Sequence, residues 1–153
     1  MESNLESKLL ISGSQDGVVV ISSLATGKVI KTLNGHTDTV ESVSFCAKLP
    51  LAASGSMDNK VIIWDINSGQ QRSVLNLSGG VVKLKWHPSD PFLFVASSDA
   101  KITLFDGRDG KVLKSFSGHS DVILDLDLSD DGNTILTCSD DKSVLVFSNQ
   151  ENN

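Results

Sequence analysis

The sequence has no long apolar run and no leader-like start. No segment approaches the roughly 18 apolar residues that a membrane span requires, so we expect no membrane association. The first residues, MESNLESK, contain neither a basic region nor an apolar stretch, and we expect no signal peptide. Only 2 of the 153 residues are cysteines. They are too few for a disulfide framework or a metal site, and their apolar surroundings predict buried free thiols.

Basic residues are also scarce. The chain has 13 Lys and Arg against 19 Asp and Glu, which gives a formal net charge of -6. Binding to nucleic-acid phosphates needs clustered basic residues, so we expect no direct contact with nucleic acid. An acidic protein instead suits basic partners. The length and the ordinary composition allow one compact domain with a sizeable core.

Long helical periodicity is absent, and a repeat of short apolar strands takes its place. Four stretches align with one another: SGSQDGVVVIS, SGSMDNKVIIW, ASSDAKITLF and TCSDDKSVLVF. Their turn aspartates, Asp16, Asp58, Asp99 and Asp141, recur at intervals of 42, 41 and 42 residues. A period of 40 to 45 residues with four strands per unit is typical of a propeller blade. The sequence therefore predicts an all-β propeller.

The predicted blades are unequal. We expect them at about residues 8–34, 39–77, 81–117 and 121–148, followed by a polar tail at 149–153. With strands named a to d from the centre outwards, the first blade has no predicted strand a and the last has no strand d. Two blades are thus complete and two partial, in a ring expected to hold seven or eight.

A partial ring leaves a blade face and sheet edges uncovered. A seven-bladed ring needs roughly 290 residues at this period, and the chain supplies about half. We therefore expect the carboxy-terminal half of a longer propeller, a truncated gene, or a chain completed by a missing half or by self-association.

The repeat resembles the WD40 family. One unit carries Gly-His, Ser, Asp and Trp-Asp at the family's positions, and the last unit carries Gly-His, Thr and Asp, with Phe147 in place of Trp. In the third unit, Ser78-Gly79-Gly80 stands where Gly-His is expected. The resemblance implies a buried hydrogen-bonded network in each of the two better units: His36, Ser54, Asp58 and Trp64, and His119, Thr137 and Asp141.

The same residue types match a hydrolase triad. However, they recur at a structural period, and no G-x-S-x-G nucleophile elbow occurs. His36, His87 and His119 fall in three different units without the paired spacing of metal ligands. We therefore expect no enzyme, no catalytic residue, no metal and no cofactor.

Charged residues occupy the predicted innermost strands, where the family usually has small residues. Ser42 and Ser44 align with Lys83 and Lys85, and with Asp125 and Asp127. This alignment predicts an ion pair between Lys85 and Asp127 of adjacent blades. The alternative is that these charges simply face a wet central channel.

Acidic residues also gather in loops at one end of the predicted blades. Seven aspartates and no Lys or Arg lie between Asp121 and Asp141. Loops on a rigid scaffold often carry binding residues. The candidate partner-binding residues are Asp38, Glu41, Met57, Asp121 and Asp140. The alternative is an acidic surface that serves solubility.

Three local features resemble the carboxy-terminal half of the angio-associated migratory cell protein family. They are the run FCAKLPLAA, the first-unit segment ATGKV, and the chain end at Val146-Phe147 before a polar tail. That family includes the fungal chaperone dedicated to a basic ribosomal protein. The resemblance implies a scaffold that binds a protein or peptide in ribosome assembly. It implies the cytoplasm as the main compartment and the nucleus as a second one. Animal members imply a signalling scaffold instead, and Phe105-Asp106-Gly107-Arg108 resembles the W-D-x-R motif of cullin ubiquitin ligase adaptors.

Overall fold

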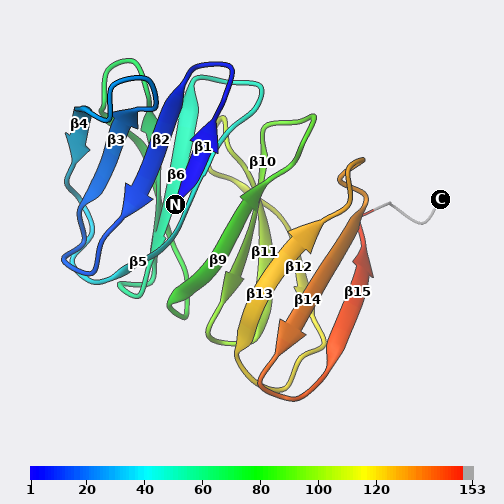
Figure 1. The fold of residues 1–153 in the computed structure, drawn as a ribbon. Helices are drawn as coiled ribbons and strands as arrows, with labels where there is room; N and C mark the ends of the chain where they lie inside the picture. Colours follow the sequence, from blue (N-terminus) through cyan, green and yellow to red (C-terminus); the bar gives the residue numbers. More distant parts are fainter. Residues whose placement is uncertain (150–153) are drawn as a thin grey trace.

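The computed structural model describes residues 1–149, which form 15 strands in four antiparallel sheets (Figure 1). The first sheet contains β1 (Glu2–Asn4), β2 (Leu9–Gly13), β3 (Val19–Ser23) and β4 (Val29–Leu33). The second contains β5 (Val40–Phe45), β6 (Leu51–Ser56), β7 (Lys60–Asp65) and β8 (Gln71–Asn76). The third contains β9 (Val81–Trp86), β10 (Phe92–Ser97), β11 (Lys101–Asp106) and β12 (Val112–Ser117). The last contains β13 (Ile123–Leu128), β14 (Thr134–Ser139) and β15 (Val144–Ser148).

The four sheets follow one another as the blades of an open propeller. Each consists of consecutive antiparallel strands, and the innermost strands contact one another in the order β1, β5, β9 and β13. Figure 1 shows the sheets standing side by side, with the ring not closed. The all-β propeller prediction is thus confirmed. Within residues 1–149, no helix is long and apolar enough to span a membrane.

The first blade departs from the prediction because it has an innermost strand. Strand β1 pairs with β2, with Glu2 opposite Ile11 and Asn4 opposite Leu9. Three blades therefore have four strands, and the last has three within the described residues. The prediction missed β1 because its sequence, Glu-Ser-Asn, is short and polar, without apolar alternation. The segment forms a strand because the backbone edge of β2 supplies its hydrogen-bond partners, and this does not depend on its side chains.

The core lies between the blades. Successive side chains of a strand point to opposite faces. In β7, Ile62 packs with Ile11 of the first blade, whereas Ile63 packs with Val95 of the third. All four side chains are almost fully buried, and each contributes roughly 1.5–3 kcal/mol of transfer free energy. Burial on both faces explains why β7 is a continuous apolar run rather than an alternating one.

The outer face of the last blade is open to solvent. Leu136, Val144 and Val146 are 46%, 62% and 66% exposed. This is the uncovered blade face that the sequence predicted. Both cysteines are free thiols, but only Cys46 is buried as predicted, because Cys138 lies half-buried on this open face.

The turns between the second and third strands of the blades share a left-handed residue. The positions are Gly17, Asn59, Ala100 and Lys142, with φ between 63° and 82°. Glycine and asparagine adopt this conformation readily, whereas Ala and Lys pay a steric cost of about 1–2 kcal/mol. At Gly17 a Cβ atom would also lie 2.8 Å from the carbonyl oxygen of His36. The turn conformation is therefore kept even where the local residue disfavours it.

We predict that Ala100→Gly raises the free energy of unfolding by about 0.5–1 kcal/mol, because glycine relieves the positive φ. The matched control is Ala25→Gly in an exposed turn without positive φ, which should lower stability instead. Urea denaturation of the three proteins measures both changes. A loss of stability in Ala100→Gly equal to that of the control would contradict the prediction.

Candidate interaction face

The second blade contains a buried chain of four side chains. His36 Nδ1 lies 2.9 Å from Asp58 Oδ2, and its Nε2 lies 2.8 Å from Ser54 Oγ. The Trp64 indole donates to the same hydroxyl oxygen over 2.8 Å. These contacts fit a neutral imidazole whose Nδ1–H donates to the carboxylate, while the Ser54 hydroxyl donates to Nε2. Every member then has its partners, which is the condition for such a network to stabilise a fold.

The last blade repeats this chain without the indole. His119 Nδ1 lies 2.9 Å from Asp141 Oδ2, and Nε2 lies 2.8 Å from the Thr137 hydroxyl. Phe147 has no hydrogen-bond donor, so the chain ends at Thr137. The hydroxyl of Ser143 donates to Asp141 over 2.6 Å. This bond leads the interactions that hold the pKa of Asp141 well below its usual range.

These networks are closed to substrates. The Ser54 side chain is fully buried and is occupied by its histidine and tryptophan neighbours, so a reacting group cannot approach its hydroxyl. Residues 1–149 contain no group of three or more His, Cys, Asp or Glu side chains able to hold a metal ion. The arrangement thus acts as an internal support.

The turn aspartates tie consecutive blades together. Asp58 Oδ2 accepts from the backbone N–H of Thr37, and Asp141 Oδ2 accepts from that of Ser120, each over 3.0 Å. Thr37 and Ser120 belong to the loops that arrive from the preceding blade. Burial opposes ionisation of Asp58, but the hydrogen bonds from the Thr37 N–H and from His36 outweigh it and lower its pKa. The arriving loops are therefore fixed by an ionised carboxylate.

The third blade lacks the network, and its register differs from the prediction. Leu77 precedes Asp99 by the 22 residues that separate His36 from Asp58, so Leu77 replaces the histidine, and Ser78-Gly79-Gly80 follows it. Asp99 instead accepts from the hydroxyl of Ser78 and from Ser97 Oγ over 2.5 Å. The segment Ser78-Gly79-Gly80, which was expected at the Gly-His position, therefore follows that position in the chain.

Asp99 also pairs with Lys101, whose Nζ lies 3.1 Å from Oδ2. Burial opposes ionisation of Asp99, but the hydrogen bonds from Ser78, Ser97 and Lys101 outweigh it and lower its pKa to about 2. The turn aspartate is therefore ionised at neutral pH in this blade too.

The innermost strands carry two ion pairs along the channel side. Lys83 Nζ lies 2.9 Å from Asp125 Oδ1, and Lys85 contacts Asp127. Both pairs bridge the third and last blades, which confirms the predicted pairing of Lys85 with Asp127. The lysine ammonium groups hold the pKa values of the two aspartates below their usual range. The side chains are about half-exposed, so the pairs also face solvent, as the alternative proposed.

Glu2 is a channel residue that the sequence did not predict. It lines a cavity of about 350 Å³ together with Ser44 and Lys85. Burial raises the pKa of its carboxyl, while a hydrogen bond from Ser44 and the charge of Lys85 act in the opposite direction. Glu2 reaches the channel only because β1 pairs with β2, and no sequence pattern predicts that pairing.

The three candidate binding aspartates lie at one end of the blades. Asp38 and Asp121 lie in the loops that enter the second and last blades, and Asp140 lies in the β14–β15 turn. These loops form the lower end of the molecule in Figure 1. We call Asp38, Asp121 and Asp140 the acidic face. All three are exposed, and none forms a salt bridge with a base in residues 1–149.

The other two candidates, Met57 and Glu41, differ in position. Met57 is exposed in the β6–β7 turn, where its side chain covers Gly80 of the next loop. Glu41 is not in a loop: it lies within β5 at a β-bulge and lines the channel cavity with Lys83. The structure thus separates Glu41 from the loop residues.

The comparisons with known proteins agree with this geometry. The family model described as WD domain, G-beta repeat matches residues 27–65, 69–106 and 110–148. The chain belongs to the WD40 repeat family. The matched segments begin and end within the blades because each covers the outer strand of one blade and the inner three of the next.

Several WD40 proteins align with nearly the whole chain. An uncharacterised WD repeat-containing protein of Schizosaccharomyces pombe is 32% identical over 94% of this chain and 36% of its own length. Angio-associated migratory cell protein of Homo sapiens is 31% identical over 94% of this chain and 37% of its own length. Nuclear distribution protein PAC1 of Komagataella phaffii is 30% identical over 92% of this chain and 32% of its own length. The chain thus spans about a third of these relatives.

The arginine of the adaptor-like motif is engaged within the WD40 chain itself. The Arg108 guanidinium folds onto the Asp106 carboxylate, with Nη2 2.6 Å from Oδ2 and Nε 2.9 Å from Oδ1. The motif begins with the last two residues of β11, at the end of the blades opposite the acidic face.

We predict that Ser54→Ala destabilises the protein more than Thr137→Val does. The first change leaves both the indole N–H and the imidazole Nε2 without partners, whereas the second orphans only an imidazole nitrogen. At about 1–3 kcal/mol for each orphaned group, we expect losses of about 2–5 and about 1–3 kcal/mol. Chemical denaturation measures both, and equal losses would argue against the four-membered chain.

We predict a small coupling free energy between Lys85 and Asp127, because both side chains are about half-exposed. A double-mutant cycle with Lys85→Ala and Asp127→Ala should give about 0.2–1 kcal/mol at low salt and less at high salt. The control cycle pairs Lys85→Ala with Asp140→Ala, a residue of the β14–β15 turn at the other end of the blade. A coupling no larger than that control rejects the ion pair as a contributor to stability.

Proposed function

We propose that this WD40 chain is a non-catalytic scaffold that binds a basic peptide on the acidic face. The observation that carries the proposal is the set of three exposed carboxylates without basic partners in residues 1–149. Unpaired surface charge of one sign attracts ligands of the opposite sign. The net charge of -6 extends that attraction beyond the contact residues.

The backbone at these residues is well suited to recognition. The Asp38 carboxylate accepts from the N–H of Thr39, and that of Asp121 accepts from the N–H of Val122. The hydroxyl of Ser56 donates to the Asp38 carbonyl over 2.9 Å, and Ser139 donates to that of Asp121 over 2.9 Å. A charged residue held in place binds with less loss of conformational entropy.

The proposed partner is a basic ribosomal protein, and the proposed role is that of a chaperone in ribosome assembly. Support comes from the acidic face and from the similarity to angio-associated migratory cell protein. We propose the cytoplasm as the site of this activity, with the nucleus as a second compartment. General signalling scaffolding is the broader alternative, in which the acidic face binds basic peptides of other origin.

The test is a titration with a Lys- and Arg-rich peptide from the amino terminus of a large-subunit ribosomal protein. Fluorescence anisotropy should show binding that weakens as salt increases. Asp121→Lys and Asp140→Lys should each weaken it roughly three- to tenfold, since each replaces an attraction with a repulsion.

The matched control is Asp130→Lys, which makes the same charge change in the β13–β14 turn, away from the acidic face. It should leave the affinity nearly unchanged. Salt-independent binding, or equal weakening by the control, would reject the acidic face as the binding site. Tight binding of a basic peptide unrelated to ribosomal proteins would favour the general scaffold.

A further inference from the structure

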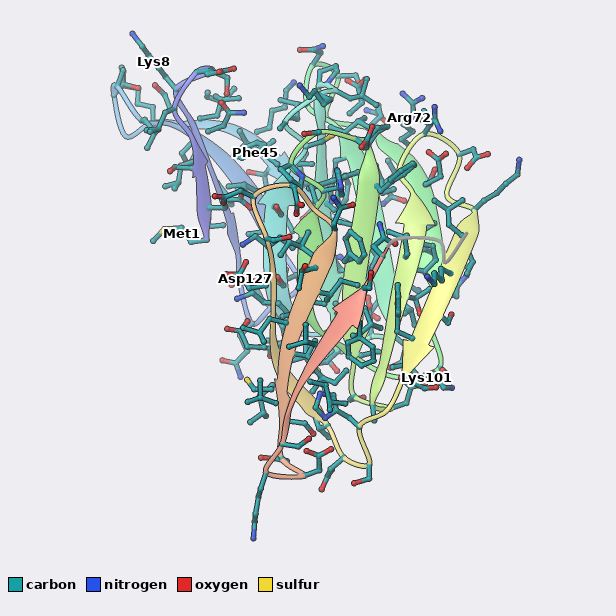
Figure 2. All side chains as sticks on the ribbon, turned by 90° about the vertical axis from the view of Figure 1, so that its right-hand side faces the viewer. Met1, Lys8, Phe45, Arg72, Lys101 and Asp127 are labelled. Atoms are coloured by element: carbon teal, nitrogen blue, oxygen red, sulfur yellow. The ribbon has the colours of Figure 1, made fainter. Side chains whose placement is uncertain are left out.

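A recess lies beside the turn aspartate of the third blade. It has a volume of about 240 Å³ and is bounded by the end of β8 on one side and by β11 and β12 on the other. Asp99 and Lys101 supply the charged part of its lining, and Phe105 and Val112 supply an apolar part. In Figure 2, Lys101 lies toward the lower end of the molecule, the end that carries the acidic face.

The recess exists because the third blade has smaller side chains than the second. In the second blade, a Cβ added at Gly35 would lie 2.3 Å from Gln71, 2.9 Å from Ile62 and 3.1 Å from Trp64, so that space is filled. By the 41-residue interval between these blades, Thr103, Phe105 and Val112 occupy the corresponding positions. These three side chains are smaller than those of the second blade. Leu77, in the place of the histidine, does not fill the volume that is left.

The recess offers hydrogen-bond acceptors that the protein leaves unused. Thr103 and Ser115 face each other across the β11–β12 ladder, and both line the recess. Neither hydroxyl forms a hydrogen bond with any residue in the described part of the chain. The Asp99 carboxylate adds negative charge, balanced by a lysine that is itself 53% exposed. The Asp99 side chain is only 24% exposed, so the lysine is the mobile partner of this pair, and an exposed ammonium group can leave at a small cost in free energy.

We propose that this recess binds an arginine side chain of a partner peptide, with Lys101 as a built-in competitor. The guanidinium donates to the Asp99 carboxylate and to the Thr103 and Ser115 hydroxyls, while its aliphatic stem packs on Phe105 and Val112. A guanidinium suits acceptors spread along a wall because it has five N–H donors in one plane. An anion is disfavoured, because the Asp99 carboxylate repels it.

This inference rests on the proposed function only in that the arginine comes from the same basic peptide. The recess and the acidic face use different residues, so one can fail without the other. A single-residue probe, N-acetyl-arginine amide, isolates the recess from the longer peptide.

The experiment is an NMR titration of the ¹⁵N-labelled 153-residue chain with N-acetyl-arginine amide. We expect saturable shifts at the amides of Ser78, Asp99 and Lys101. Thr103→Val should weaken binding at least threefold, and Lys101→Met should strengthen it at least threefold by removing the competitor. The matched control is Lys60→Met, the corresponding change in the second blade, where the recess is filled. It should leave the affinity unchanged.

Three results would overturn the proposal: no saturable shifts, equal binding of N-acetyl-lysine amide, or no gain of affinity in Lys101→Met over Lys60→Met. The Asp121→Lys and Asp140→Lys double variant separates the two hypotheses. It should weaken the binding of the ribosomal peptide but not the binding of the arginine probe. Loss of peptide binding with an intact arginine response supports both hypotheses. The reverse pattern, intact peptide binding with a lost arginine response, contradicts both, because the peptide then does not need the acidic face and the arginine probe does.

Discussion

The hydrogen bonds made by the turn aspartates are the interaction on which the rest of this propeller depends. Asp58 and Asp141 each bind a backbone N–H of the loop that arrives from the preceding blade. One carboxylate therefore fixes a turn in its own blade and the entry of the chain into that blade. The apolar faces supply the free energy that brings the sheets together, but such packing is non-directional. The aspartates add the direction.

This constraint also positions the acidic face. Asp38 and Asp121 follow immediately after Thr37 and Ser120, whose N–H groups the turn aspartates hold. The same bonds that support the fold thus fix the backbone of the proposed binding residues. Met57, in the turn beside Asp58, benefits from the same support.

The third blade shows what happens when the support is kept but the network is lost. Asp99 is still bonded, now by hydroxyls and by Lys101, and the turn keeps its left-handed residue at Ala100. Leu77 and Phe105 do not occupy the volume that histidine and tryptophan fill in the second blade. A recess results at a place that is filled in the second blade.

The repeat period, the strand alternation and the turn aspartates were enough to predict the propeller and the pairing of Lys85 with Asp127, because each is local or repeats at a fixed interval. The sequence by itself thus determined the blade and its register where Gly-His was present. Only the tertiary structure decided that Glu-Ser-Asn forms β1, that Glu2 lines the channel cavity, and that Glu41 lies within a strand. These outcomes depend on free backbone edges, on neighbouring blades and on a bulge. None of the three is encoded in the side chains of the segment itself.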